Sequence, residues 1–369
     1  MSKETGYEDI MNAKKTHTME ETDRKCPQCG GTMDFDPATG GLHCPYCGYQ
    51  EEIEDSASAS ATVAEQDFAS AELTGNCDWG VAQKTVSCKS CGAQSVYDAL
   101  EVASICPYCG SNQVMEVNDV TTLAPGGVVA FKITAKQAGD AFKTWIKKKW
   151  FCPKEAKESA KAESFQGVYL PYWTFDADTM TSYTAKYGIE RTVERGDKTE
   201  TVTDWYPTSG TYSQFINDQL VSGTTSHEES TMCAIEPFDT EDNRAYRPEY
   251  IAGFAAERYS IGLKDAWEKA KNFIRGRLEG LIESKIRDEK HADDVKNLML
   301  NTTYQNITYK YLMLPIWISS FTYKGKVYQF MVNGQTGKVG GHSPISALRV
   351  ALAVLIALAV IWLITWLSN

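Results

Sequence analysis

Hydrophobic and polar positions follow two different periods from about residue 120 onward, and together they predict a mixed α+β domain over residues 120–342. Apolar residues at three-to-four spacing predict a helix that begins after an N-cap at Thr134 and ends before Pro153. A second stripe predicts a long helix from about Leu263 to Arg287. Its apolar face is formed by Trp267, Ala270, Ile274, Leu278 and Leu281.

Segments rich in Tyr, Trp, Thr and Val predict β-strands between and after these helices. They comprise Val168–Ala177, Met180–Tyr187, Thr199–Tyr206, Thr308–Ile318, Ser320–Tyr323 and Lys326–Val332.

A short motif occurs twice in this domain. Tyr169-Leu-Pro-Tyr-Trp173 returns as Met313-Leu-Pro-Ile-Trp317, each time after a Trp-bearing helix. The repetition predicts two similar helix-plus-strand halves packed as one domain. Because proline cannot donate a backbone hydrogen bond, each motif is expected at a sheet edge or a bulge.

The carboxy-terminal residues show no polar face at all. Val350–Leu367 holds eighteen residues without a charge, enough for a helix of roughly 27 Å. We expect a single transmembrane helix over 348–367, with Trp362 and Trp366 at the interface. A buried core helix is disfavoured because no chain remains to cover it. Basic residues precede the helix, so the folded part is expected in the cytoplasm, at the cell membrane.

The amino-terminal third is polar and acidic. Residues 1–120 contain 7 Lys and Arg against 20 Asp and Glu, in a chain of net charge −11. Residues 1–23 are expected to form a flexible tail, and 51–75 an acidic Ser/Ala linker. Because the start contains no apolar run, a secretory signal is not expected, and the eleven cysteines fit a reducing cytosol.

Eight of those cysteines form one pattern that occurs twice. In each copy two Cys-x-x-Cys-Gly knuckles are separated by fourteen residues, which predicts two closed four-thiolate sites of zinc-ribbon type over 24–50 and 76–117. Such sites hold structure and leave no open coordination position. The expected ligands are Cys26, Cys29, Cys44 and Cys47 in the first ribbon and Cys88, Cys91, Cys106 and Cys109 in the second.

The metal expected in both sites is Zn²⁺. Iron is the chemical alternative, because rubredoxin-like ribbons of di-iron proteins use similar spacing. Those chains also carry Glu-x-x-His pairs, which this sequence lacks.

No motif in the sequence indicates catalysis. Asn333-Gly-Gln-Thr-Gly-Lys338 departs from phosphate-loop spacing and predicts a tight turn, with positive φ at its glycines. No Ser/His/Asp set or paired general acid stands out. The chain is therefore not expected to be an enzyme.

The motifs together resemble a family of bacterial membrane-anchored proteins with zinc ribbons of the transcription-factor-B type. The resemblance covers nearly the whole chain and rests on the paired knuckles, Asp78-Trp-Gly80, the two Leu-Pro motifs, Pro248-Glu-Tyr-Ile-Ala-Gly253 and Val332–Lys338. It implies a protein without a helicase motor, despite the primosomal-helicase labels that such proteins often carry. It also implies a connection to phage-shock-type envelope-stress proteins and flotillin-like scaffolds.

Two classes of function fit these features. The first is a membrane-anchored adaptor whose ribbons, on an acidic flexible arm, dock a cytosolic protein. The second is a tethered nucleic-acid-binding protein. Nucleic-acid binding requires clustered Lys and Arg. Each ribbon contains only two basic residues: Arg24 and Lys25 in the first, and Lys84 and Lys89 in the second. The adaptor is the favoured hypothesis.

Overall fold

The computed structural model describes residues 25–53, 63–69, 83–88, 94–98, 114–117, 124–159, 165–195, 198–324 and 326–367. Over these ranges the protein is a mixed α+β structure, as the sequence predicts. The expected tail at 1–23, most of the second ribbon and the motif Asp78–Gly80 lie outside the described residues.

The described strands fall into two sheets. A small sheet contains β1 (Asp34–Asp36), β2 (Gly41–His43) and β3 (Gln50–Glu51). The large sheet contains β4 (Gln66–Asp67), β5 (Gln83–Cys88), β6 (Gln94–Asp98), β7 (Val114–Val117), β8 (Gly127–Val128), β9 (Gln166–Arg195), β10 (Lys198–Ser222), β11 (Arg244–Ala245), β12 (Ala255–Glu257), β13 (Asp294–Tyr323), β14 (Lys326–Asn333) and β15 (Val339–Gly341).

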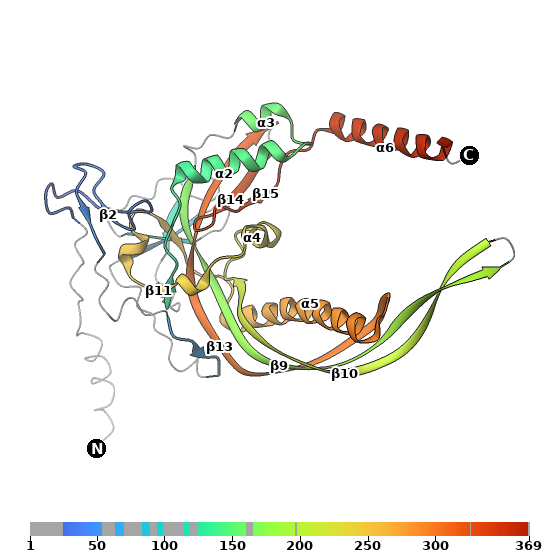
Figure 1. The fold of residues 1–369 in the computed structure, drawn as a ribbon. Helices are drawn as coiled ribbons and strands as arrows, with labels where there is room; N and C mark the ends of the chain where they lie inside the picture. The colour runs from blue at the N-terminus through green and yellow to red at the C-terminus, as the bar shows by residue number, and fades with distance from the viewer. Residues whose placement is uncertain are drawn as a thin grey trace, which may run out of the picture.

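The described helices pack against the large sheet, except for the last one, which extends away from it. They are α2 (Ala135–Lys148), α3 (Lys154–Ser159), α4 (Glu229–Ile235), α5 (Leu263–Lys290) and α6 (Ala347–Leu367), with 3₁₀ turns η3 (Thr240–Asp242) and η4 (Pro248–Ile251). Figure 1 shows the long strands β9, β10 and β13 as a curved ribbon with α5 on its concave side.

The centre of the fold is the antiparallel pair of β9 and β13. Leu170 lies opposite Leu314, with Pro171 opposite Met313 and Pro315 opposite Tyr169. The two Leu-Pro motifs therefore face each other, related by an approximate twofold axis between the two leucines. Both leucines are completely buried.

The surroundings of the two motifs repeat this symmetry. The outer side of β9 pairs first with β12, in parallel, and then with antiparallel β10. The outer side of β13 pairs with parallel β8 and then with antiparallel β14. Each half thus runs short strand, helix, long strand, returning strand.

Along the outer side of each long strand, one neighbouring strand ends and another begins, and each proline lies at this point. The carbonyl of Pro171 accepts a hydrogen bond from Gly223 just after β10, and that of Pro315 accepts one from Gly334 just after β14, both at 2.8 Å. The N–H and C=O of a strand residue point to the same side. The N–H that each proline lacks would therefore point between the two neighbouring strands, where no strand needs it as a hydrogen-bond donor. The sheet tolerates proline here within central strands, rather than at the edge or bulge expected from the sequence.

The two helices predicted within 120–342 begin and end close to the predicted positions, whereas α3 and α4 were not predicted. Thr134 caps α2 through a capping box with Gln137. On α5 the buried face runs through Ile274, Leu278, Ile282 and Ile286, whereas Leu281 is 36% exposed. The prediction of Leu281 as a core residue is wrong because the buried stripe advances in steps of four residues.

The strands around α5 are longer than predicted. Segments 168–177 and 180–187 form the single strand β9, because its pairing with β10 and β13 continues through Asp178 and Thr179. Beyond Gly188 the strand pairs only with β10, and Figure 1 shows this hairpin extending past the body.

The chain ends in α6, which is long and apolar enough to cross a membrane, and none of its apolar stretch is buried. Trp362 and Trp366 stack with ring centroids 6.4 Å apart near its far end. Ribbon one, which contains β2, and α6 lie at opposite ends of the molecule (Figure 1).

Leucine truncation on α5 tests the corrected helix face. Because Leu278 is completely buried, Leu278→Ala is expected to lower the free energy of unfolding by about 2–5 kcal/mol. The matched control Leu281→Ala changes the same atoms on the exposed side and should cost well under half as much. Urea unfolding of both variants measures this, and equal losses would contradict the assignment.

Candidate functional site

Four cysteine sulfurs of ribbon one converge on one point. Cys26 Sγ lies 3.4 Å from Cys47 Sγ, and Cys29 Sγ lies 3.5 Å from Cys44 Sγ. All four sulfurs fall within 4.8 Å of one another. Sulfurs arranged tetrahedrally around one Zn²⁺ at about 2.3 Å would lie about 3.8 Å apart, so these residues fit a four-thiolate metal site.

Two equivalent turns bring these sulfurs together. In the first knuckle Gly30 N–H bonds to Cys26 O, and in the second Gly48 N–H bonds to Cys44 O. Both glycines have positive φ, 71° and 78°, with no neighbouring atom that a Cβ would meet. These glycines are therefore needed for the backbone conformation of the two knuckles.

Within the cluster, Cys44 is favoured as the thiolate over its neighbours. Burial raises the pKa of Cys44, but the backbone N–H groups of Cys47 and Tyr46 and neighbouring thiols lower it by more, to about 7, whereas the pKa values of Cys29 and Cys47 are raised. The donors are supplied by the knuckle itself.

The second set of predicted ligands is described only in part. Cys88 ends β5, whereas Cys91, Cys106 and Cys109 lie outside the described residues. The strands of this region are joined to the main sheet, because β6 pairs with β12 through Val96 and Ala256. The second site therefore stays a prediction.

Ribbon one is attached to the body through the motif at 248–253. Phe35 N–H donates to Ala252 O at 3.0 Å, and the Phe35 ring meets Tyr250 edge-on. Gly253 has φ +78°, and a Cβ there would lie 2.8 Å from Asp34. A glycine is thus required both by the backbone and by the approach of the ribbon.

The segment between the ribbons is also attached to the body. Residues 63–69 lie within the predicted flexible linker, yet β4 pairs with β13, and Phe68 packs against Phe175 and Trp267. The expectation of a flexible linker is wrong for these residues, because an aromatic side chain and a strand edge hold them.

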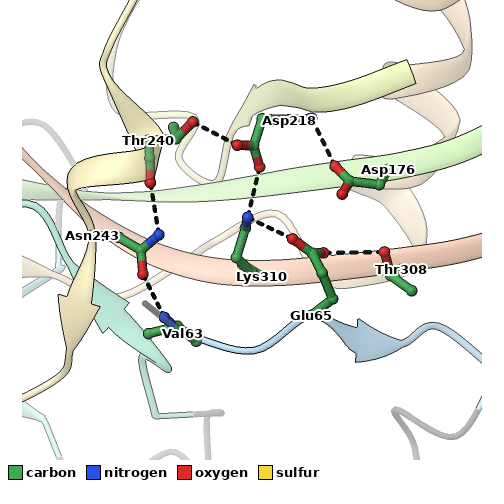
Figure 2. Close-up of polar contacts among 8 residues, drawn as sticks. All are labelled: Val63, Glu65, Asp176, Asp218, Thr240, Asn243, Thr308 and Lys310. Carbon is green, nitrogen blue, oxygen red and sulfur yellow. Dashed lines mark hydrogen bonds and ion pairs between the residues drawn. The ribbon is translucent and has the colours of Figure 1, made fainter. Parts of the chain in front are cut away.

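A partly buried group of charges holds the same segment, and Figure 2 shows its members. Lys310 Nζ on β13 lies 2.5 Å from Glu65 and 2.8 Å from Asp218 on β10. Thr308 Oγ1 donates to the other oxygen of Glu65, and Thr240 Oγ1 donates to Asp218. Lys310 is only 8% exposed, so its ammonium group depends on these partners.

Asp176 on β9 completes the group. Its Oδ1 accepts the N–H of Asp218, a residue with φ +47° at the irregularity in β10. Burial raises the pKa of Asp176 to about 6. Glu65, Asp176 and Asp218 could together hold a cation, but the Lys310 ammonium already lies against two of them. We interpret the group as an internal ion pair that fixes the segment.

This group was not predicted from the sequence. Its one signal is a charged residue in an otherwise apolar and aromatic run, Tyr309-Lys310-Tyr-Leu-Met-Leu314. A lysine on the buried side of a strand requires a carboxylate partner, but the sequence does not indicate which one.

The block at 333–338 is a turn, as predicted, between β14 and β15. Gly337 has positive φ, whereas Gly334 does not and is required by close packing against Phe131. Completely buried Asn333 donates to the carbonyls of Ile235 and Pro237. The block holds the segment after α4 in place.

A cavity of about 310 Å³ lies between β10, α4 and α5. Burial raises the pKa of Glu236 in its wall to about 7, although Lys338 opposes this. Burial also lowers the pKa of His227 to about 4, so this imidazole is neutral at physiological pH. These features do not assign a reaction, and the absence of catalysis stays a prediction.

Comparison with known proteins gives one similar chain. An uncharacterized protein of Bacillus subtilis (strain 168), YdjG, is 29% identical over 333 residues, which cover 89% of this chain and 91% of that one. No family model matches the chain. No solved structure matches it either.

Replacing one ligand tests the metal centre. Because Cys44 is completely buried between the knuckles, Cys44→Ser should reduce the metal content of the purified chain by one ion, measured by elemental analysis. The control is Cys233→Ser, an exposed cysteine on α4, which should leave the metal content unchanged. An unchanged metal content in Cys44→Ser would contradict the assignment of Cys44 as a metal ligand. Detection of iron in place of zinc would contradict the prediction that the metal is Zn²⁺.

A neutral side chain at Asp176 tests the buried group. The pKa of Asp176 is about 6 in the folded chain, against an ordinary value of 3.8. Ionised Asp176 therefore lowers the stability of the folded chain above about pH 6, and this loss of stability disappears below about pH 4. Asn keeps an oxygen for the Asp218 N–H. Asp176→Asn should therefore stabilise the chain at about pH 8 and lose this advantage at about pH 4.

Urea unfolding at both pH values measures the difference. The control is Asp178→Asn, which changes an exposed carboxylate on the same strand outside this group and should not reproduce the gain in stability at about pH 8. A large loss of stability in Asp176→Asn at about pH 8 would mean that the ionised carboxylate is required.

Proposed function

We propose that this chain is a membrane-anchored adaptor with structural zinc, whose ribbon binds a protein partner at the inner face of the cell membrane. The observation that carries the proposal is the placement of a four-thiolate ribbon and an apolar helix at opposite ends of one folded body (Figure 1). With α6 in the bilayer, the ribbon would extend away from the membrane surface.

The outer side of ribbon one has the features of a docking surface. Its inner side is buried through Met33, Phe35 and Leu42. The knuckles face solvent, and Tyr46 between the second pair of ligands is 77% exposed. Tyrosine is favoured in protein interfaces because it combines a large apolar ring with a hydrogen-bonding group.

The charge of the ribbon supports a protein partner over a nucleic acid. Residues 25–53 contain one lysine, Lys25, against Asp34, Asp36, Glu51 and Glu52. Phosphate binding requires an excess of Lys and Arg, and its affinity would be low on such a surface. Proteins of the envelope-stress or flotillin-like kind, which the resemblance implies, are the first partners to test.

The attachment of the ribbon makes the proposed adaptor rigid. The Phe35–Ala252 hydrogen bond and the contact of Phe35 with Tyr250 hold the ribbon to the body. A partner would therefore bind at a fixed distance from the membrane, and little conformational entropy of a linker would be lost on binding. The flexible arm expected from the sequence is not needed for this function.

Changing Tyr46 tests the docking surface. Because Tyr46 contacts solvent and is not a metal ligand, Tyr46→Ala should abolish crosslinking of a specific partner in native membranes while metal content stays unchanged. Phe215→Ala, which removes another exposed ring on β10, is the control and should retain the partner. Partner capture that does not depend on Tyr46, or micromolar DNA binding at physiological salt, would contradict the proposal.

A further inference from the structure

The corner between α2 and α3 is fixed to the first turn of α6. Arg349 Nη1 donates to the carbonyl oxygens of Trp150 and Cys152, at 2.6 and 2.8 Å. The backbone N–H of Ser346, just before α6, donates to Phe151 O at 2.9 Å. Figure 1 shows α6 leaving the body beside the α2 end of this corner.

The length of α6 determines how close this corner lies to the membrane surface when α6 spans a bilayer. Ala347–Leu367 is 21 residues, or about 31 Å of helix, against about 30 Å of hydrocarbon. Because the helix has no length to spare, its first turn must lie at the membrane–water interface when it spans the bilayer. Trp150 and Phe151, bonded to that turn, must then lie at the same level.

The composition of the corner matches that position. Trp150 and Phe151 are 51% and 41% exposed, although both are aromatic, and their rings meet edge-on at 5.1 Å. Trp is enriched at the membrane–water interface, and Phe is found with it on the membrane-facing side of helices that lie there.

The same corner is strongly basic. Residues 143–157 contain one acidic residue, Glu155, and six lysines, namely Lys143, Lys147, Lys148, Lys149, Lys154 and Lys157. Lys147 and Lys148 end α2, are exposed, and form no ion pair with any residue that the structure describes. Lys149 lies over the Trp145 ring, 4.6 Å from its centroid.

We propose that this basic corner, residues 143–157, binds the headgroups of anionic phospholipids in the bilayer that α6 enters. The inference rests on the proposed membrane anchor and adds a lipid-binding site to it. Each lysine close to an anionic surface strengthens attachment about fivefold, and salt weakens it because the charges are exposed. Bound headgroups would also orient the body on the membrane, since the corner and α6 form two separate attachments.

Photocrosslinking of the full-length chain tests the proposal. Trp150 is replaced by p-benzoylphenylalanine, and the protein is reconstituted in vesicles of equal parts phosphatidylcholine and phosphatidylglycerol. Mass spectrometry then identifies lipid adducts. We expect adducts at position 150 with phosphatidylglycerol enriched several-fold, and loss of this enrichment at high salt or in Lys147→Gln/Lys148→Gln/Lys149→Gln.

Two control positions separate the possible failures. The same probe at Leu358 in α6 should give adducts without headgroup preference, and at exposed Met299 on β13 it should give none. Adducts at 358 but not at 150 would overturn the lipid site and leave the anchor standing. Adducts at 150 without enrichment of phosphatidylglycerol would overturn the role of the lysines, and adducts at neither position would overturn the anchor itself.

Discussion

The antiparallel pairing of β9 and β13 holds together the elements at both ends of the molecule. The two Leu-Pro motifs meet at its centre, and each proline marks the point where a neighbouring strand changes. Both ends of the molecule are connected to this pair. On one side, the hydroxyl of Tyr169 on β9 donates to the carbonyl of Tyr250. Tyr250 lies in the turn that ribbon one contacts. On the other, Phe330 of β14 stacks on Phe142 of α2, which leads to the corner beside α6.

Ribbon one is stabilised in part by its contacts with the body. A segment of about thirty residues is too small to fold on its own core, and a metal bound by the four cysteines would supply part of the missing stability. Here its inner side is also closed by Ala252 and the turn around it. The segment leading toward the second ribbon is in turn held by Lys310 and by Phe68. The cysteine cluster, the turn and the ion pair therefore belong to one continuous unit.

Much of the fold could be predicted because its signals are local. Capping at Thr134, the stripe of α5 and the knuckle glycines depend on residues close in sequence. The repeated motif also indicated the duplication, although not that the two copies pair with each other. The four thiolates of ribbon one could be predicted for the same reason, since two short turns supply them all.

The parts that could not be predicted depend on contacts between distant residues. Glu65 and Lys310 are separated by 245 positions, and neither has a local pattern that identifies the other. The acidic composition of 51–75 indicated a linker because a single aromatic residue, Phe68, is too weak a signal for an attached segment. Arg349 and Trp150 meet only because α2 and α6 are brought together by the sheet.

The contacts of Phe35 with Tyr250 and Ala252 make ribbon one a fixed part of the body and not an independent module. Hydrogen exchange of the full-length chain with and without chelator tests this attachment. Removal of the metal should increase exchange in 25–53 and also in the turn at 248–253, while β9 and β13 around Leu170 and Leu314 stay protected. Faster exchange confined to 25–53, with no change at 248–253, would mean that ribbon one is an independent module.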